Sequence, residues 1–120
     1  MDYNLDGKIF RSVSNTANGE VGAETLFHYR QSGDIVTATY SGGEIVSGHL
    51  IAKVLPNGQL DMRYHHLNRT GEFMLGTCVS TPRRLHDGRL SFSEQWQWLS
   101  GDRSSGHSEI EEAPNVVSQK

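Results

Sequence analysis

Small turn-forming residues recur along the chain at intervals that leave room for one short strand between them. The clusters lie at residues 32–34, 42–43, 56–58, 68–71, 86–88 and 100–102. Glycine and asparagine adopt positive φ at low cost, as tight hairpin turns require. Large and polar residues alternate between the clusters, which is typical of half-buried strands. The chain is therefore predicted to be a series of consecutive β-hairpins.

Eight strands are predicted, and no window sustains a helical period; the helix candidates are a short turn within residues 18–24 and the segment after Thr81. The strands are expected at residues 8–14, 24–31, 35–41, 44–54, 59–67, 72–81, 89–99 and 104–112. An even number of strands in meander order lets the last pair with the first, which removes both exposed edges. We predict an all-β fold, a single antiparallel up-and-down barrel that resembles the lipocalin and avidin architectures. It would span residues 1–112, followed by a flexible tail over 113–120.

The segment at 89–99 holds both tryptophans and has the clearest two-faced pattern. Its inward face is predicted to carry Leu90, Phe92, Glu94, Trp96 and Trp98. A carboxylate on a buried face must be paired, protonated or functional, because an unpaired buried charge is costly. Two alternatives follow: either the aromatic rings fill the barrel and Glu94 pairs with an arginine or a tyrosine hydroxyl, or they surround a cavity.

For the other strands, the face richer in large apolar groups is the candidate inner face, although a small barrel can carry apolar residues on both. By this criterion the inner set includes Leu60, Met62, Tyr64 and His66. On the strand at 72–81, Phe73, Leu75 and Val79 alternate with smaller residues that include Gly76 and Cys78. The strand at 44–54 could face either way, and its Gly48 indicates a bend or a bulge.

The connections after the first, third, fifth and seventh strands of a meander lie at the same end of the barrel. The long polar loop at 14–23 and the polar cluster at 100–108 therefore share a rim with 42–43 and 68–71. Long loops on a rigid barrel carry function more often than short turns. The predicted ligand-binding residues are Tyr64, His66, Glu94, Trp96 and Trp98 inside the barrel, with Asn15, Asn18 and Asp102 at the rim.

Composition restricts the partners and the location. The net charge of −3, from 11 basic and 14 acidic residues, gives no basic footprint for nucleic acid. The N-terminus lacks the features of a signal peptide, and no apolar run is long enough to span a bilayer. The single cysteine excludes an internal disulfide framework. We expect a cytoplasmic protein without a nucleic-acid or membrane partner. The candidate partners are a small-molecule ligand and a second copy of the chain, in a homodimer formed through the barrel wall.

Evidence for cofactor or catalytic chemistry is weak. His65 and His66 are adjacent, so on a regular strand they point to opposite faces and cannot bind one metal ion together. No serine lies in a nucleophile elbow, and Cys78 fits a small strand residue. An acid–base pair would require Glu94 and His66 to meet across the cavity. The sequence favours a non-catalytic binding module without metal or cofactor. Two alternatives stay open: a structural or interaction protein that acts as a homo-oligomer, and an enzyme.

Several segments resemble a family of small uncharacterised bacterial proteins that are often labelled N-acetylglutamate synthases. They are residues 10–21 (FRSVSNTANGEV), 37–43 (TATYSGG), 60–64 (LDMRY), and 96–98 (WQW) with 100–102 (SGD). The resemblance runs from about Gly7 to Glu112 and implies membership of that family without assigning a catalytic residue. Residues 103–108 (RSSGHS) nearly match an acetyl-CoA-binding motif. That motif needs a following helix to bind the pyrophosphate, and the remaining 12 residues, with Pro114 among them, predict none.

Overall fold

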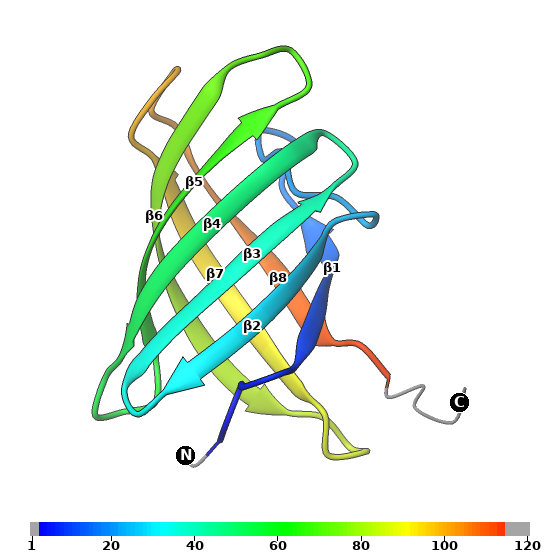
Figure 1. The fold of residues 1–120 in the computed structure, drawn as a ribbon, viewed down its shortest axis with the longest axis vertical. Coiled ribbons are helices and arrows are strands. Elements are labelled where there is room, and N and C mark those ends of the chain that lie inside the picture. Colours follow the sequence, from blue (N-terminus) through cyan, green and yellow to red (C-terminus); the bar gives the residue numbers. More distant parts are fainter. Residues whose placement is uncertain (1–2, 115–120) are drawn as a thin grey trace.

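In the computed structural model, which describes residues 3–114, the chain forms one closed antiparallel barrel (Figure 1). Its strands are β1 (Ile9–Asn15), β2 (Leu26–Ser32), β3 (Ile35–Gly42), β4 (Ile45–Val54), β5 (Leu60–Asn68), β6 (Phe73–Arg84), β7 (Leu90–Trp98) and β8 (Ser105–Glu112). Each strand pairs with the next in sequence, and β8 pairs with β1. The predicted all-β barrel and its eight strands are confirmed.

The strand boundaries follow the turn chemistry. They agree with the expected ones within two residues, except that β6 continues to Arg84. Pro82 is accommodated in β6 opposite Phe92, so the helix considered after Thr81 is absent and a strand takes its place. The residues at 18–24 form turns and irregular chain, and no helix. Nothing in residues 3–114 forms a helix that is long and apolar enough to cross a membrane.

The predicted domain boundary at Glu112 falls at the end of β8. Ala113 still donates its backbone N–H to the carbonyl of Ile9 at 2.7 Å, so the ladder extends one residue beyond this strand. Most of the predicted tail, residues 115–120, lies outside the described residues, as do residues 1–2.

Large apolar side chains pack the lower end of the barrel in Figure 1, where β1 begins. Phe10 contacts Tyr29 and Phe92 with ring centroids 5.1 and 5.6 Å apart. The segment before β1 adds the buried Leu5 and the ring of Tyr3, which meets Phe92 edge-on at 5.8 Å. The inward face predicted for β7 is confirmed, because its alternate residues from Leu90 to Trp98 are all buried. This end of the barrel is solidly filled.

On β6 the larger side chains point outward, against the size criterion. Phe73 is 71% exposed, and Leu75 and Val79 are exposed as well. The inner face carries Gly76 and Cys78, which lie opposite Trp98 and Trp96 in the β6–β7 ladder. A Cβ atom on Gly76 would lie 2.3 Å from the Tyr64 hydroxyl, so no larger residue fits there. Gly76 faces inward on β6 because the Tyr64 ring of β5 already occupies the space beside it.

The orientation of β4 is settled by close packing around Gly48. Its inner face carries Gly48, Leu50 and Ala52. A Cβ atom on Gly48 would lie 2.5 Å from the Tyr40 ring and 2.9 Å from the His66 Cβ, so this glycine admits two larger neighbours. The β4–β5 ladder shifts register between Ile45 and Ser47, which confirms a bulge near the expected position.

The four connections predicted to share a rim do so at the upper end in Figure 1: β1–β2, β3–β4, β5–β6 and β7–β8. Because it belongs to this rim, the long β1–β2 loop lies over the less densely filled end of the barrel.

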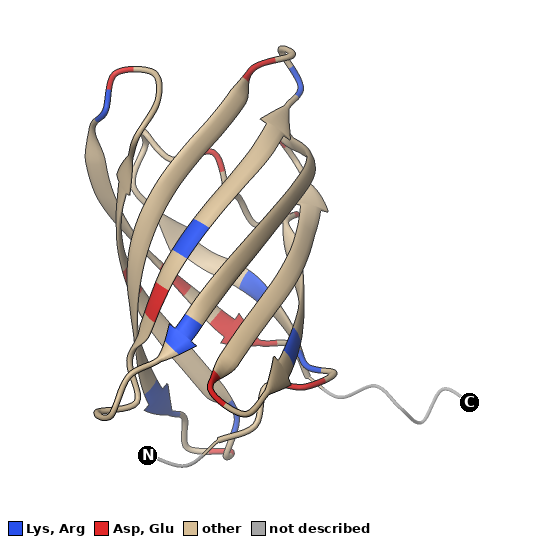
Figure 2. Cartoon of the chain, turned by 60° about the vertical axis from the view of Figure 1, so that its left-hand side comes forward, with Lys and Arg blue, Asp and Glu red and all other residues tan. Residues whose placement is uncertain are grey.

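Charged residues are spread over strands and turns of the barrel, without a single-sign cluster in the view of Figure 2.

Candidate functional site

A cavity of about 50 Å³ lies inside the upper half of the barrel, beneath the β1–β2 loop. Its lining residues come from the loop and from all eight strands: Asn15, Gly19, Glu20, Val21, Phe27, Tyr40, Leu50, Met62, Tyr64, His66, Cys78, Glu94, Trp96, Trp98 and Ser108. About 10–15 Å³ of such volume holds one water molecule. The upper half of the interior is therefore neither solidly filled nor widely hollow, and it has room for a few small atoms beneath the loop.

Glu94 lies in the wall of this cavity and is 8% exposed. One carboxyl oxygen accepts a hydrogen bond from Ser108 at 2.9 Å, and the other accepts a longer one from Ser80 at 3.4 Å. The arginine or tyrosine partner expected from the sequence is therefore wrong, because two serine hydroxyls take that place. Burial raises the pKa of Glu94 to about 7, and the two serine hydrogen bonds oppose this shift.

Aromatic rings form the walls on either side of Glu94. The indoles of Trp96 and Trp98 have ring centroids 5.5 Å apart, and Tyr64 meets Trp98 at 5.8 Å. The Trp98 indole N–H donates to the backbone carbonyl of Asn18 at 3.1 Å, which attaches the loop to the barrel wall. A set of rigid, mostly apolar surfaces with few polar groups is the usual composition of a small-molecule site.

The β1–β2 loop forms the roof of the cavity. The Asn15 amide nitrogen donates to the Val21 carbonyl at 3.0 Å and holds the loop in a compact turn. A Cβ atom on Gly19 would lie 2.3 Å from that amide nitrogen, so a larger residue there would displace the Asn15 side chain. The Asn18 side chain donates to Ser104 and to the Ser105 carbonyl across the rim. The roof is held mainly by polar contacts, which open at lower cost than a packed core.

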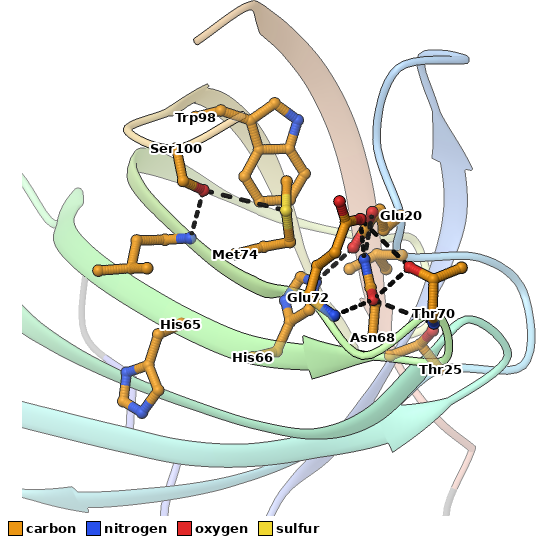
Figure 3. A network of polar contacts seen from close by, with 12 residues as sticks. Glu20, Thr25, His65, His66, Asn68, Thr70, Glu72, Met74, Trp98 and Ser100 are labelled. Carbon is orange, nitrogen blue, oxygen red and sulfur yellow. Dashed lines mark hydrogen bonds and ion pairs between the residues drawn. The ribbon is translucent and has the colours of Figure 1, made fainter. Parts of the chain in front are cut away.

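Glu20 connects the roof to the barrel interior (Figure 3). One carboxyl oxygen lies 2.7 Å from His66 Nε2, and the other accepts from the Asn68 amide at 3.0 Å. His66 Nδ1 lies 3.0 Å from the Tyr40 hydroxyl. Burial lowers the pKa of His66 and outweighs the opposing effect of the Glu20 hydrogen bond. The neutral ring, with its proton on Nε2, donates to Glu20 and accepts from Tyr40. Both ring nitrogens of His66 therefore have a hydrogen-bond partner.

Asn68 joins the same contacts to the β5–β6 turn. It is almost fully buried, and its carbonyl oxygen accepts from the backbone N–H groups of Thr70 and Glu72. Its amide group donates to Glu20 and Glu72, which brings two carboxyl groups to one side chain (Figure 3). The neighbouring His65 points away from this network, as its exposed position on the outer wall requires.

The structure brings six of the eight predicted site residues together around the cavity: Asn15, Tyr64, His66, Glu94, Trp96 and Trp98. Asn18 is exposed and contacts the site only through its backbone carbonyl. Asp102 is exposed and stays within its own turn, where its carboxyl group accepts from the Ser104 N–H at 2.9 Å and its pKa is thereby lowered. Because its hydrogen-bond partner lies in the same turn, Asp102 does not reach the cavity.

Sequence reasoning missed other residues of the site. Glu20 lies in the loop that was singled out, but nothing in a loop sequence tells which side chain reaches inward. Tyr40 lies on the inner face of β3, and its role as the partner of His66 depends on the registers of β3 with β4 and of β4 with β5. Cys78 lines the cavity, and burial raises the pKa of its thiol, which keeps it protonated at neutral pH. Ser108 could have been found only by pairing β7 with β8.

The pair of Glu94 and His66 does not meet as an acid–base couple. Both line the cavity, but the hydrogen bonds of Glu94 go to serines and those of His66 go to Glu20 and Tyr40. Within residues 3–114 there is no group of three or more histidine, cysteine, aspartate or glutamate side chains that could hold a metal ion. The arrangement can bind and orient a molecule, and its one histidine is bonded to Glu20 and Tyr40 rather than to Glu94.

Comparison with known families agrees with this geometry. Residues 3–113 match the family model described as avidin-like protein, which is nearly the whole chain. The chain therefore belongs to the avidin-like family. A search of curated proteins finds no match. The family match supports the resemblance to a family of small β-barrel proteins and does not bear on the N-acetylglutamate synthase label.

The role of Glu20 can be tested by Glu20→Ala. We expect amide hydrogen exchange over residues 16–23 to accelerate by about tenfold or more, because a charge-assisted hydrogen bond contributes about 1.5–3 kcal/mol. Glu24→Ala, at an exposed position next to the same loop, is the matched control and should leave these rates unchanged. Equal exchange in both variants would show that Glu20 does not hold the roof.

Proposed function

We propose that this protein is a non-catalytic module that binds a small molecule in the cavity beneath the β1–β2 loop. The observation that supports it most is the lining: aromatic walls and one almost fully buried carboxyl group under a roof held by polar contacts. Such a site provides affinity through the rings and orientation through a few polar atoms. The avidin-like family match supports the same kind of module.

The size of the cavity indicates how a ligand enters. A volume of about 50 Å³ accommodates only a few heavy atoms, so a larger ligand must displace the roof formed by residues 15–21. Breaking the contacts of Glu20 and Asn18 would open this end while the filled lower end keeps the barrel intact. Loop opening of this kind precedes ligand entry in many closed sites.

A ligand screen followed by intrinsic tryptophan fluorescence tests this proposal, because both tryptophans of the chain line the cavity. The panel contains small amines, alcohols, amides and cyclic ureas, with biotin included because of the family match. We expect at least one saturable change in emission that also raises the unfolding temperature. If no compound in the panel changes the tryptophan emission saturably, the proposal is contradicted.

Two variants on one strand localise the binding. Cys78→Leu adds two heavy atoms inside the cavity and should weaken ligand binding by tenfold or more, whereas Val79→Leu adds one on the outer face and should not. Both variants are first checked for a native circular-dichroism spectrum. Equal binding in the two folded variants would place the ligand outside the barrel.

Homodimer formation has one observation in its favour. The outer wall across β4–β6 exposes Ile51, Leu75 and Phe73, beside the rings of His49 and His65, which are inclined to each other by 50°. Apolar side chains gathered on one wall are typical of interfaces. Sedimentation equilibrium at high protein concentration tests homodimer formation, and a monomeric mass at that concentration would contradict it.

The cytoplasmic location and bacterial origin expected from the sequence stay predictions.

A further inference from the structure

Two groups in the lining of the cavity have hydrogen-bond acceptor capacity that the protein does not fill. A carboxylate has about four acceptor positions, and Glu94 receives one short and one long hydrogen bond. The amide oxygen of Asn15, another lining residue, is buried without a partner among the described residues. The amide nitrogen of Asn15 is already bonded to Val21, which fixes the orientation of the group. A ligand that fits these atoms must itself supply N–H or O–H donors.

The charges of the lining favour a positive ligand. Among the described residues, no lysine or arginine lines the cavity, while Glu94 and Glu20 both do. His66 does not offset them, since burial lowers its pKa and favours the neutral ring. An ionised carboxylate in this position has only hydroxyl partners, and burial of a charge without a counter-charge is costly. A cation would supply the missing counter-charge.

The aromatic rings suit the same ligand. Trp96 and Trp98 are inclined to each other by 57°, and both line the cavity with Glu94. The face of an indole attracts a cation within about 6 Å of its centroid, and more strongly where water is excluded. An ammonium group next to a carboxylate and two indoles therefore gains from both kinds of contact.

We propose that the ligand is a small organic cation, whose primary ammonium group donates hydrogen bonds to Glu94 and whose apolar body packs against Trp96 and Trp98. This inference rests on the proposed function, because it names the class of ligand for the same cavity.

Binding of such a cation is coupled to the ionisation of Glu94. The titratable groups around Glu94 are Tyr29 of β2, Tyr40 of β3, Tyr64 of β5 and Cys78 of β6, with His66 of β5 and Glu20 of the roof above them. Burial raises the pKa of each tyrosine and of Cys78, so these groups stay protonated near neutral pH. Because the pKa of Glu94 is about 7, affinity should fall about tenfold per pH unit below 7 and level off above it.

Two pairs of probes of equal size separate charge from shape: propylammonium with 1-propanol, and benzylammonium with benzyl alcohol. Each is titrated into the wild-type protein and Glu94→Gln at pH 6 and pH 8, at constant ionic strength, and followed by fluorescence and by the indole N–H signals. At pH 8 we expect the wild type to bind each amine at least tenfold more tightly than its alcohol. The amine affinity should fall about tenfold at pH 6, and Glu94→Gln should lose both the preference and the pH dependence.

The outcomes distinguish this inference from the proposed function. If the amines and the alcohols shift the indole signals with equal affinity, the cation preference is overturned while the site remains. A preference for amines that persists in Glu94→Gln overturns the role of Glu94. If no probe and no member of the wider panel shifts either indole signal, the proposed function fails and this inference fails with it.

Discussion

Replacement of Glu94 by glutamine is expected to raise the free energy of unfolding at pH 8 by about 3 kcal/mol. The pKa of Glu94 is raised by burial from 4.5 to about 7, and one pKa unit corresponds to about 1.4 kcal/mol. The folded protein holds this proton more tightly than the unfolded chain does. The contribution of Glu94 to stability is therefore complete below pH 4.5 and is lost as the pH rises to about 7. Glutamine keeps the shape of the side chain and carries no charge at any pH.

Urea unfolding of the wild type and the variant between pH 4.5 and pH 8 measures this effect. The difference between the two should grow over this range and become constant above about pH 7. His66 acts in the opposite direction, because its pKa is lowered and its contribution is lost as the pH falls, but it is present in both proteins and cancels. Glu44→Gln, at an exposed position, is the control and should change stability by less than about 0.5 kcal/mol. A parallel pH dependence in wild type and Glu94→Gln would contradict the assigned environment of Glu94.

Replacement of Gly42 by alanine is expected to destabilise the barrel by about 3 kcal/mol or more. Gly42 has a φ of 117°, which side-chain-bearing residues rarely adopt, and an added Cβ would lie 2.1 Å from the Glu24 carbonyl oxygen. Backbone atoms cannot move aside as a flexible side chain can. The Gly42 carbonyl also accepts from the Thr25 hydroxyl at 3.0 Å, so the strain would reach the end of the roof loop.

The adjacent glycine provides a matched control for this variant. Gly43 has a φ of 64°, and an added Cβ would have its nearest neighbour at 3.8 Å. Gly43→Ala should therefore cost only about 1 kcal/mol, from the left-handed backbone alone. The shift in the urea midpoint at constant m value compares the two. Equal losses would mean that the contact with Glu24 is relieved by movement of the loop.

The fold could be predicted from the sequence because two local signals agree: turn residues with positive φ and two-residue alternation between them. The orientation of β6 could not be predicted in this way, because it depends on side chains from another strand. Phe73 and Leu75 are the larger residues, but Gly76 and Cys78 face inward, and at Gly76 the Tyr64 ring of β5 fills the space that a larger side chain would need. Size alone indicates the inner face only where the facing strand leaves room.

The site was predicted best where it is built on strands. Trp96, Trp98, Glu94 and Tyr64 follow from strand parity, and the shared rim follows from the alternation of strand direction. The loops offer no such rule: Asp102 and Glu20 are both acidic loop residues, yet Asp102 bonds within its own turn and Glu20 reaches His66. The roof is fixed by long-range hydrogen bonds, and these depend on the closed barrel rather than on any local pattern.

The most direct test of ligand binding at this site is a titration followed by the two tryptophan indole N–H signals in ¹H–¹⁵N spectra. Trp96→Phe and Trp98→Phe assign the signals, which report from inside the cavity. A ligand bound beneath the roof should shift both signals saturably, with the Trp98 signal most affected because its hydrogen bond to Asn18 changes as the roof moves. Saturable shifts confined to backbone amides of the outer wall, with both indole signals unmoved, would contradict a binding site inside the barrel.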